Sequence, residues 1–189
     1  MIDVAEGIPP FHFNVAHAHD LAVIAVARDG RVGIDLEFVR ADFEWMTVAR
    51  RFFSPRELTG ILTVPTRKQA EAFFAGWTRK EACLKAIGCG LAGGLEGIEL
   101  STGHGRQAVL VAAPREMSPV SRWKLIDLTP GDGYKACMVV EGDVAHVRQW
   151  DWPGELLGDR PAWLESSKPS ADPIGTGRSA EKGAVASDG

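Results

Sequence analysis

The chain has 189 residues, 45% of them hydrophobic, which is enough for one buried core but too few for two ordinary domains. Its net charge of −4 and pI near 5.7 exclude the chain-wide basic field that is typical of nucleic-acid-binding proteins. Because no apolar run approaches the roughly 18 residues of a membrane span, and the N-terminus does not resemble a signal peptide, we expect a cytoplasmic protein with no membrane or nucleic-acid partner.

Strand-like segments occupy the N-terminal part of the sequence. Phe11–Val15 alternates between apolar and polar residues, and the apolar run Leu21–Ala27 follows it after the separating residues His17–Asp20. This arrangement predicts a first hairpin. The dipeptide Asp29-Gly30 then precedes the strand-like segment Arg31–Phe38. Because Asp-Gly is typical of tight two-residue turns, it predicts a second hairpin.

Helix signals occupy the middle of the sequence. Ser54–Glu57 combines an N-cap hydroxyl, a proline at the first helical position and a glutamate that can close a capping box. Thr66–Gln69 repeats the capping-box pattern before a long helical stretch that reaches Ile87. Gly88 or Gly90 is expected to end this helix.

The remaining segments with strand character are Ala108–Ala112, Trp123–Leu128 and Tyr134–Val140, the last two joined by the turn-rich Pro130–Gly133. Strands, then helices, then strands favour an α+β fold over a parallel βαβ array. We therefore expect a mostly antiparallel sheet packed against the long helix. From Leu156 onward the hydrophobic periodicity stops, so the sequence predicts one domain at residues 1–155 and a disordered tail at residues 156–189.

Two acidic residues share one face of the predicted strand Arg31–Phe38. Its apolar residues occupy alternate positions from Val32 onward, which places Asp35 and Glu37 together on the other face. Residues two apart on a strand lie about 6.5–7 Å from each other, so both carboxylates could reach one divalent cation. An ordinary solvent-facing acidic pair on an edge strand is the alternative.

A third acidic residue falls on the apolar stripe of the long predicted helix. Glu81 lies between Trp77 and Leu84 at helical spacing, where a buried carboxylate would need a cation or a proton. Lys80 and Lys85 lie nearby in the same helix. The alternative is a solvent-exposed Glu81–Lys85 pair one turn apart. Three carboxylates and a lysine would suit Mg²⁺ bound to a substrate pyrophosphate.

Longer motifs around these residues resemble a known enzyme family. Val32–Glu37 and Trp77–Lys85 resemble the two signature motifs of the 4′-phosphopantetheinyl transferases, and Phe13–His17 resembles a third. Their order is that of the surfactin-synthetase-activating type. The resemblance covers roughly residues 11–140 and includes Arg51–Pro55.

The resemblance implies roles for the matching residues. Asp35, Glu37 and Glu81 would bind Mg²⁺, and Glu81 would also be a candidate base for the serine of the carrier protein. Lys85 and Lys80 would contact the phosphates of coenzyme A. The implied reaction moves the 4′-phosphopantetheine group of coenzyme A to that serine of an acyl or peptidyl carrier protein.

The sequence departs from the family pattern in two respects. His17 would contact the 3′-phosphate of coenzyme A, but Ala16 stands where the motif usually has a serine. Family members of this type also contain two similar halves with the active site between them, and most of the first half has no counterpart here. The missing half suggests a homo-oligomer that completes the site.

Other functions remain open at the level of sequence. One is a catalytically silent, truncated homologue that binds metal or carrier protein, and another is a Mg²⁺-dependent phosphohydrolase. A zinc site formed by His12, His17 and His19 is a further alternative, although no fourth ligand is evident.

Overall fold

The computed structural model describes residues 11–90, 94–101 and 108–151. The chain divides into a unit of residues 1–147 and a unit of residues 148–189, and the fold described below belongs to the first. The predicted tail at residues 156–189 lies outside the described residues. In the described part of the chain, no helix has the length and apolar character needed to cross a membrane.

The first two strands form the hairpin that the sequence predicts. Strand β1 (His12–Ala18) pairs with β2 (Leu21–Ala27) in antiparallel register, with Ala18 opposite Leu21. His19 in the turn has a positive φ of 54°, and the hydroxyl of Tyr134 donates a hydrogen bond to the carboxylate of Asp20. The turn is therefore fastened to the rest of the unit.

The central sheet has the strand order β3-β7-β6 and is antiparallel throughout. Its strands are β3 (Val32–Phe38), β6 (Trp123–Leu128) and β7 (Tyr134–Glu141). The turn expected between the last two strands is confirmed, since β6 pairs with β7.

The second predicted hairpin is wrong. Gly30 does have the positive φ of a turn residue, at 85°, but β2 pairs with β1 whereas β3 pairs with β7. The turn therefore carries the chain from one sheet into another. A side chain at Gly30 would lie 2.2 Å from the carbonyl oxygen of Glu141, so close packing at the end of β7 also requires glycine.

Three helices follow β3 in the described chain: α1 (Trp45–Phe52), α2 (Pro55–Leu62) and α3 (Thr66–Ala86). The capping box of α2 is confirmed, because Ser54 Oγ accepts from the backbone of Glu57 and the Glu57 side chain accepts from the backbone of Ser54. The second predicted capping box is wrong. Pro65 occupies the N-cap position of α3 without a side-chain cap, and Gln69 instead donates to the carbonyls of Leu62, the last residue of α2, and of Val64.

Short elements complete the unit. They are η2 (Leu95–Gly97), β4 (Glu99–Leu100), β5 (Leu110–Ala112), η3 (Arg115–Met117) and η4 (Val120–Arg122). Strands β4 and β5 form a separate antiparallel pair, and β5 covers only the second half of the predicted segment Ala108–Ala112.

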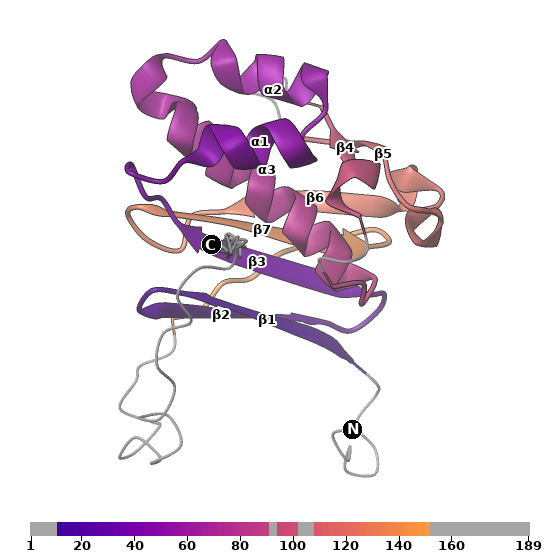
Figure 1. The fold of residues 1–189 in the computed structure, drawn as a ribbon. Coiled ribbons are helices and arrows are strands. Elements are labelled where there is room, and N and C mark those ends of the chain that lie inside the picture. The colour runs from indigo at the N-terminus through magenta and orange to yellow at the C-terminus, as the bar shows by residue number, and fades with distance from the viewer. Residues whose placement is uncertain (1–10, 91–93, 102–107, 152–189) are drawn as a thin grey trace, which may run out of the picture. The chain divides into compact units, whose positions relative to one another are not determined.

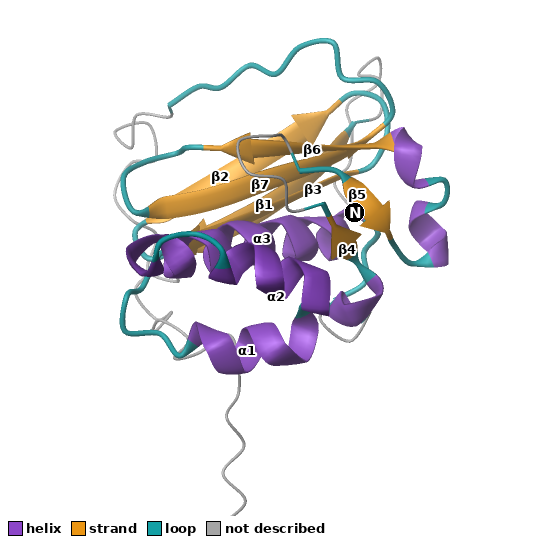
Figure 2. Cartoon of the chain, turned by 90° about the horizontal axis from the view of Figure 1, so that it is seen from above, coloured by secondary structure: helices purple, strands orange, loops and turns teal. Residues whose placement is uncertain are grey.

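The central sheet lies between two layers (Figure 1). Helix α3 packs across β3 and β7 on one face, and the β1–β2 hairpin packs on the other. Figure 2, turned by 90°, shows the helices along one side of the same sheet, with α3 next to it. The alternation of β3 is as predicted, because Val32, Ile34 and Leu36 join the core formed with the hairpin. The predicted α+β fold, an antiparallel sheet with a long helix, is confirmed.

Gly33 allows α3 to approach the sheet closely. A Cβ atom at this position would lie 2.1 Å from the carbonyl oxygen of Ala82 and 2.4 Å from the backbone nitrogen of Ala86. Both obstacles are helix backbone, which cannot move aside as a flexible side chain can. The next inward residue of β3, Asp35, is thereby held directly against the helix.

Candidate active site

The three predicted carboxylates come from two elements that pack together. Asp35 and Glu37 extend from β3 on the side that faces α3, and Glu81 extends from α3 itself. Asp35 is only 6% exposed, and Glu37 and Glu81 are half-buried. The structure therefore brings a strand pair and a helix residue into one acidic cluster.

Asp35 is the most deeply buried member of this acidic cluster, and it is only half satisfied. Its Oδ1 atom accepts a hydrogen bond of 2.7 Å from Lys85 Nζ. Its Oδ2 atom is buried without a hydrogen-bond partner. A buried carboxylate oxygen without a donor or cation is costly, so this atom is suited to bind a cation or to accept a hydrogen bond from a ligand.

The three carboxylates of the cluster influence one another electrostatically. Burial, followed by the negative charge of Asp35, raises the pKa of Glu37 to about 7. The same two causes raise the pKa of Glu81 to about 7. Burial also raises the pKa of Asp35, although Lys85 opposes the change. The three acids repel one another, and the positive charge of Lys85 opposes the rise in the pKa of each.

The helix stripe around Glu81 is buried as predicted. Phe74, Trp77 and Leu84 are all at most 5% exposed. Lys85 forms its ion pair with Asp35 of β3. This geometry replaces the alternative of a solvent-exposed Glu81–Lys85 pair, since the lysine is engaged across the helix–strand interface.

The carboxylate oxygens of the acidic cluster are chemically suited to bind a divalent cation, but their present positions do not form a complete metal site. Carboxylate oxygens are the ligands that Mg²⁺ prefers, and Asp35 Oδ2 is free to coordinate. However, no group of three or more histidine, cysteine or acidic side chains in the described ranges is already placed to hold a metal ion. That finding covers the acidic cluster and the predicted histidine zinc site alike. Closing the acidic cluster on a cation would require its side chains to move.

The contacts described for Lys80 are with residues outside the acidic cluster. Its ammonium group is fully buried, 3.0 Å from Glu57 Oε2, and donates to the backbone carbonyls of Leu95 and Ile98. The predicted contact between Lys80 and a coenzyme A phosphate would require this arrangement to break.

His17 is exposed on β1. It belongs to the hairpin, which covers the sheet face opposite to α3, and no hydrogen bond or ion pair described for it joins it to the carboxylates. Its neighbour Asn14 has a structural role that the sequence did not reveal, because Asn14 Oδ1 accepts a hydrogen bond from the backbone of Ile34 in β3.

Arg40 is a further charged residue near the acidic cluster that sequence reasoning missed. Its positive charge counteracts the rise in the pKa of Glu37. The signal available in the sequence was its position two residues after β3 ends, three residues beyond Glu37.

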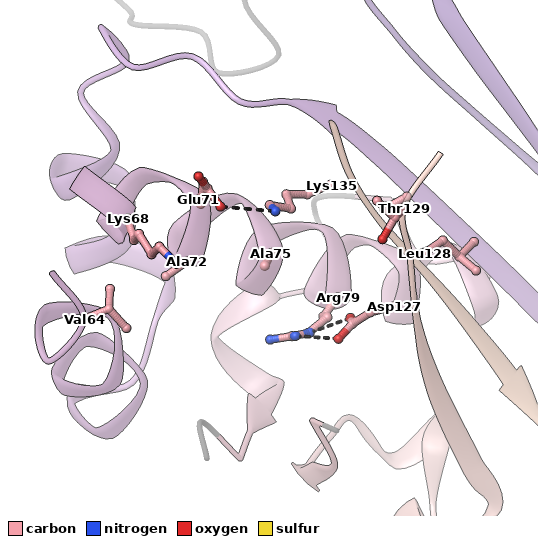
Figure 3. Close-up of a pocket in the computed structure, with 11 residues that line it drawn as sticks. Val64, Lys68, Glu71, Ala72, Ala75, Arg79, Asp127, Leu128, Thr129 and Lys135 are labelled. Atoms are coloured by element: carbon pink, nitrogen blue, oxygen red, sulfur yellow. Dashed lines mark hydrogen bonds and ion pairs between the residues drawn. The ribbon is translucent and has the colours of Figure 1, made fainter. Parts of the chain in front are cut away.

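Another part of α3 faces a hollow of about 320 Å³ between the helix and the end of the β6–β7 ribbon. Figure 3 shows the two ion pairs that cross it: Arg79 with Asp127 at 2.7 Å, and Glu71 with Lys135 at 3.3 Å. The residues that line the hollow do not include the candidate carboxylates. This side of α3 is braced by paired charges.

Comparisons with known proteins agree with the motifs. Residues 31–139 match the family described as the 4′-phosphopantetheinyl transferase superfamily. The 4′-phosphopantetheinyl transferase HetI of Nostoc sp. is 38% identical over 140 residues, which cover 74% of this chain and 56% of HetI. The 4′-phosphopantetheinyl transferase psf-1 of Bacillus pumilus is 38% identical over 107 residues, covering 57% of this chain and 45% of psf-1. The chain thus spans about half the length of these relatives.

Solved structures of holo-acyl-carrier-protein synthases are also similar. The protein from Bacillus anthracis, in complex with CoA (3′,5′-ADP), has a TM-score of 0.49 at 17% identity, covering 60% of this chain and 96% of that one. The protein from Helicobacter pylori, in complex with coenzyme A, has a TM-score of 0.46 at 20% identity, covering 59% and 99%.

Proposed function

Because the chain belongs to the 4′-phosphopantetheinyl transferase superfamily, we propose that it transfers the 4′-phosphopantetheine group of coenzyme A to a serine of an acyl or peptidyl carrier protein. The serine oxygen forms a bond to the phosphorus that carries the pantetheine arm. The bond from that phosphorus to the bridging oxygen breaks, and adenosine 3′,5′-bisphosphate leaves. The serine proton passes to Glu81, directly or through a water molecule.

One observation supports this proposal. Lys85 of α3 contacts Asp35 of β3, and the second carboxylate oxygen of Asp35 is buried without a hydrogen-bond partner. The negative charge of Asp35 also acts on Glu37 and Glu81. Such a cluster is costly to the folded state, and perturbed acids concentrate at functional sites. A pyrophosphate substrate with its cation would supply the missing positive charge.

Mg²⁺ is the cation that we propose, with Asp35, Glu37 and Glu81 as its ligands. When bound, it would neutralise the charge that develops on the leaving phosphate. Lys85 would then exchange part of its contact with Asp35 for a non-bridging phosphate oxygen. Glu81 would hold the attacking hydroxyl close to the phosphorus, and exposed His17 would remain available to the 3′-phosphate.

The experiment is a transfer assay that weighs the product. Apo carrier protein is incubated with the chain, coenzyme A and MgCl₂, and the carrier protein is then weighed by mass spectrometry. We expect a gain that matches the phosphopantetheine arm with wild type, none with Asp35→Ala, and an undiminished gain with Glu71→Ala. Glu71 is a matched control because it is an acidic residue of α3 that pairs with Lys135. No gain with any carrier protein tried would contradict the proposal.

A second candidate function is a catalytically silent homologue that binds carrier protein or metal. The observation that favours it is that, among the described residues, no three histidine, cysteine or acidic side chains are already placed to hold a metal ion. Tight binding of apo carrier protein without any mass gain would support this alternative.

We also propose that a second copy of the chain covers the apolar part of the hairpin's outer face and leaves His17, near the turn, uncovered. Phe13 opposes Val26 and Val15 opposes Ile24, and these four apolar side chains are 46–68% exposed. Apolar patches of this kind commonly mark association sites. Sedimentation at increasing concentration should show a dimer or larger assembly that is lost in Val15→Lys with Ile24→Lys. A monomer at high concentration that still transfers phosphopantetheine would contradict self-association.

A further inference from the structure

A buried ion pair joins α2 to α3 outside the acidic cluster. Glu57 and Lys80 lie 3.0 Å apart, and each side chain is 1% exposed. Removing two opposite charges from water is expensive, and the cost is recovered only when the remaining donors and acceptors are also satisfied. The surroundings of both residues therefore show what this pair does.

The ammonium group of Lys80 has no free donor. A lysine ammonium has three N–H bonds. Here they have three acceptors: Glu57 Oε2, the carbonyl of Leu95 at 3.3 Å and the carbonyl of Ile98. The ring of Phe53 covers the same nitrogen, with its centroid 5.1 Å away. No donor remains for a substrate phosphate.

The carboxylate of Glu57 is satisfied as completely. Its Oε2 atom accepts from the backbone nitrogen of Ser54 at 2.7 Å, and its Oε1 atom accepts from the backbone nitrogen of Leu100 at 3.0 Å. Together the two side chains connect the start of α2, the middle of α3, η2 and β4. The pair thus joins α2, α3 and the η2–β4 segment, three parts of the chain that are distant in sequence.

Lys80 directly precedes Glu81 in α3, so the junction can control the direction in which the Glu81 side chain points. Successive residues of an α-helix are turned by about 100°, and Lys80 and Lys85 by about 140°, so the two lysines leave α3 in different directions. Anchoring Lys80 at one side fixes the direction in which Glu81 and Lys85 leave the helix. Lys85 accordingly reaches Asp35, whereas Lys80 reaches Glu57.

We propose that Lys80 is a positioning residue, which fixes the rotation of α3 through Glu57 and does not bind the phosphates of coenzyme A. The inference rests on the proposed function in that Glu81 and Lys85 are the groups being positioned. It replaces the phosphate-binding role that the family motif implied for Lys80.

The first test observes the Lys80 ammonium group of the wild-type chain directly by ¹⁵N NMR of its lysine side chains. Protons of a buried, fully bonded ammonium exchange slowly with water, so we expect a Lys80 signal at neutral pH. Adding coenzyme A with MgCl₂ should leave this signal unchanged and should shift that of Lys85. Rapid exchange of the Lys80 protons, or a shift of the Lys80 signal on adding coenzyme A, would overturn the proposal.

The second test is a cycle of the variants Lys80→Met and Glu57→Gln, alone and together. Misplacing a reacting group by 1 Å costs about 100-fold in rate. We therefore expect each single variant to lower kcat by about tenfold to 100-fold with a KM for coenzyme A near the wild-type value. The double variant should be no slower than the slower single variant, because both changes break the same junction.

A phosphate contact would give a different pattern, in which Lys80→Met raises the KM for coenzyme A at least about tenfold and Glu57→Gln leaves it unchanged. Arg79→Met is the matched control, since Arg79 is the adjacent cation of α3 and pairs with the more exposed Asp127.

If wild type transfers no phosphopantetheine, the proposed function fails separately from the proposed role of Lys80. Slow exchange and a non-additive loss of stability in the cycle would then still support the junction, and additive losses would overturn it.

Discussion

Two ionic clusters share helix α3 and differ in how completely they are satisfied. In the Glu57–Lys80 junction every donor and acceptor of the two side chains has a partner. In the acidic cluster around Asp35, one buried oxygen has none, and burial raises the pKa of both Glu37 and Glu81 to about 7. Breaking a satisfied buried pair is costly, whereas an unsatisfied cluster itself costs stability that a bound ligand can restore.

The largest expected effect is on catalysis. Glu81→Gln keeps the shape of the side chain but removes a base and a cation ligand, so kcat should fall by about 100- to 10 000-fold. The same change removes a repelled charge, so the free energy of unfolding without metal should not fall. Transfer rates and urea denaturation of one preparation check both statements. If Glu81→Gln were less stable than wild type but had a normal kcat, Glu81 would serve stability and not catalysis, which would contradict the contrast drawn between the two clusters.

The next effect concerns the close approach that places Asp35 against α3. Gly33→Ala introduces a methyl group within 2.1 Å of the carbonyl oxygen of Ala82, so the helix must shift away. We expect a loss of about 1–3 kcal/mol in the free energy of unfolding, together with lower transfer activity. Gly90→Ala is a matched control, because a Cβ atom there meets nothing within 4 Å. Equal stability of the two variants in urea denaturation would contradict the packing described for Gly33.

The pH dependence of the free energy of unfolding gives a further test of the strain in the acidic cluster. In the unfolded chain Glu37 and Glu81 lose their protons near pH 4.5, but in the folded protein they do so near pH 7. Between these values the folded state binds more protons, so the stability contributed by the protonated acids is complete below about pH 4.5 and is lost as the pH rises through about 7.

This loss is measured as the difference in urea midpoint between about pH 5 and about pH 8 in the presence of a chelator. It should be smaller in Glu81→Gln than in wild type. At the higher pH, added MgCl₂ should raise the wild-type midpoint. An identical decline in wild type and Glu81→Gln would show that Glu81 is not strained in the folded state.

The smallest effect is expected at the ion pair shown in Figure 3. Arg79 and Asp127 are 21% and 47% exposed, so their attraction is weakened by water. Asp127→Asn should cost only about 0.2–1 kcal/mol, in contrast to the larger cost of breaking a buried pair. A loss as large as that of Glu57→Gln in the same urea experiment would mean that exposure does not distinguish the two pairs.

The sequence predicted what depends on local alternation and helical spacing. The two faces of β3, the first hairpin, the capping box of α2 and the stripe around Glu81 follow from neighbouring residues. These patterns placed Asp35, Glu37 and Glu81 correctly on their elements. The family motifs added the chemistry that the cluster suits.

Properties that depend on distant partners were not predictable. Asp29-Gly30 gave the turn, but only the pairing of β3 with β7 shows that the turn joins two sheets. Lys80 and Lys85 look alike in the motif, and which of them meets Glu57 depends on how α2 packs against α3. Helix α1 went unpredicted, since its eight residues carry no side-chain cap.

The most direct test of the account is the position of a bound cation. Crystals grown with MnCl₂ and coenzyme A would locate the metal by its anomalous scattering. The account predicts a single strong peak in contact with carboxylate oxygens of Asp35, Glu37 and Glu81, with Lys80 still bonded to Glu57. A metal bound elsewhere, or Glu81 turned away from the two acids of β3, would contradict it.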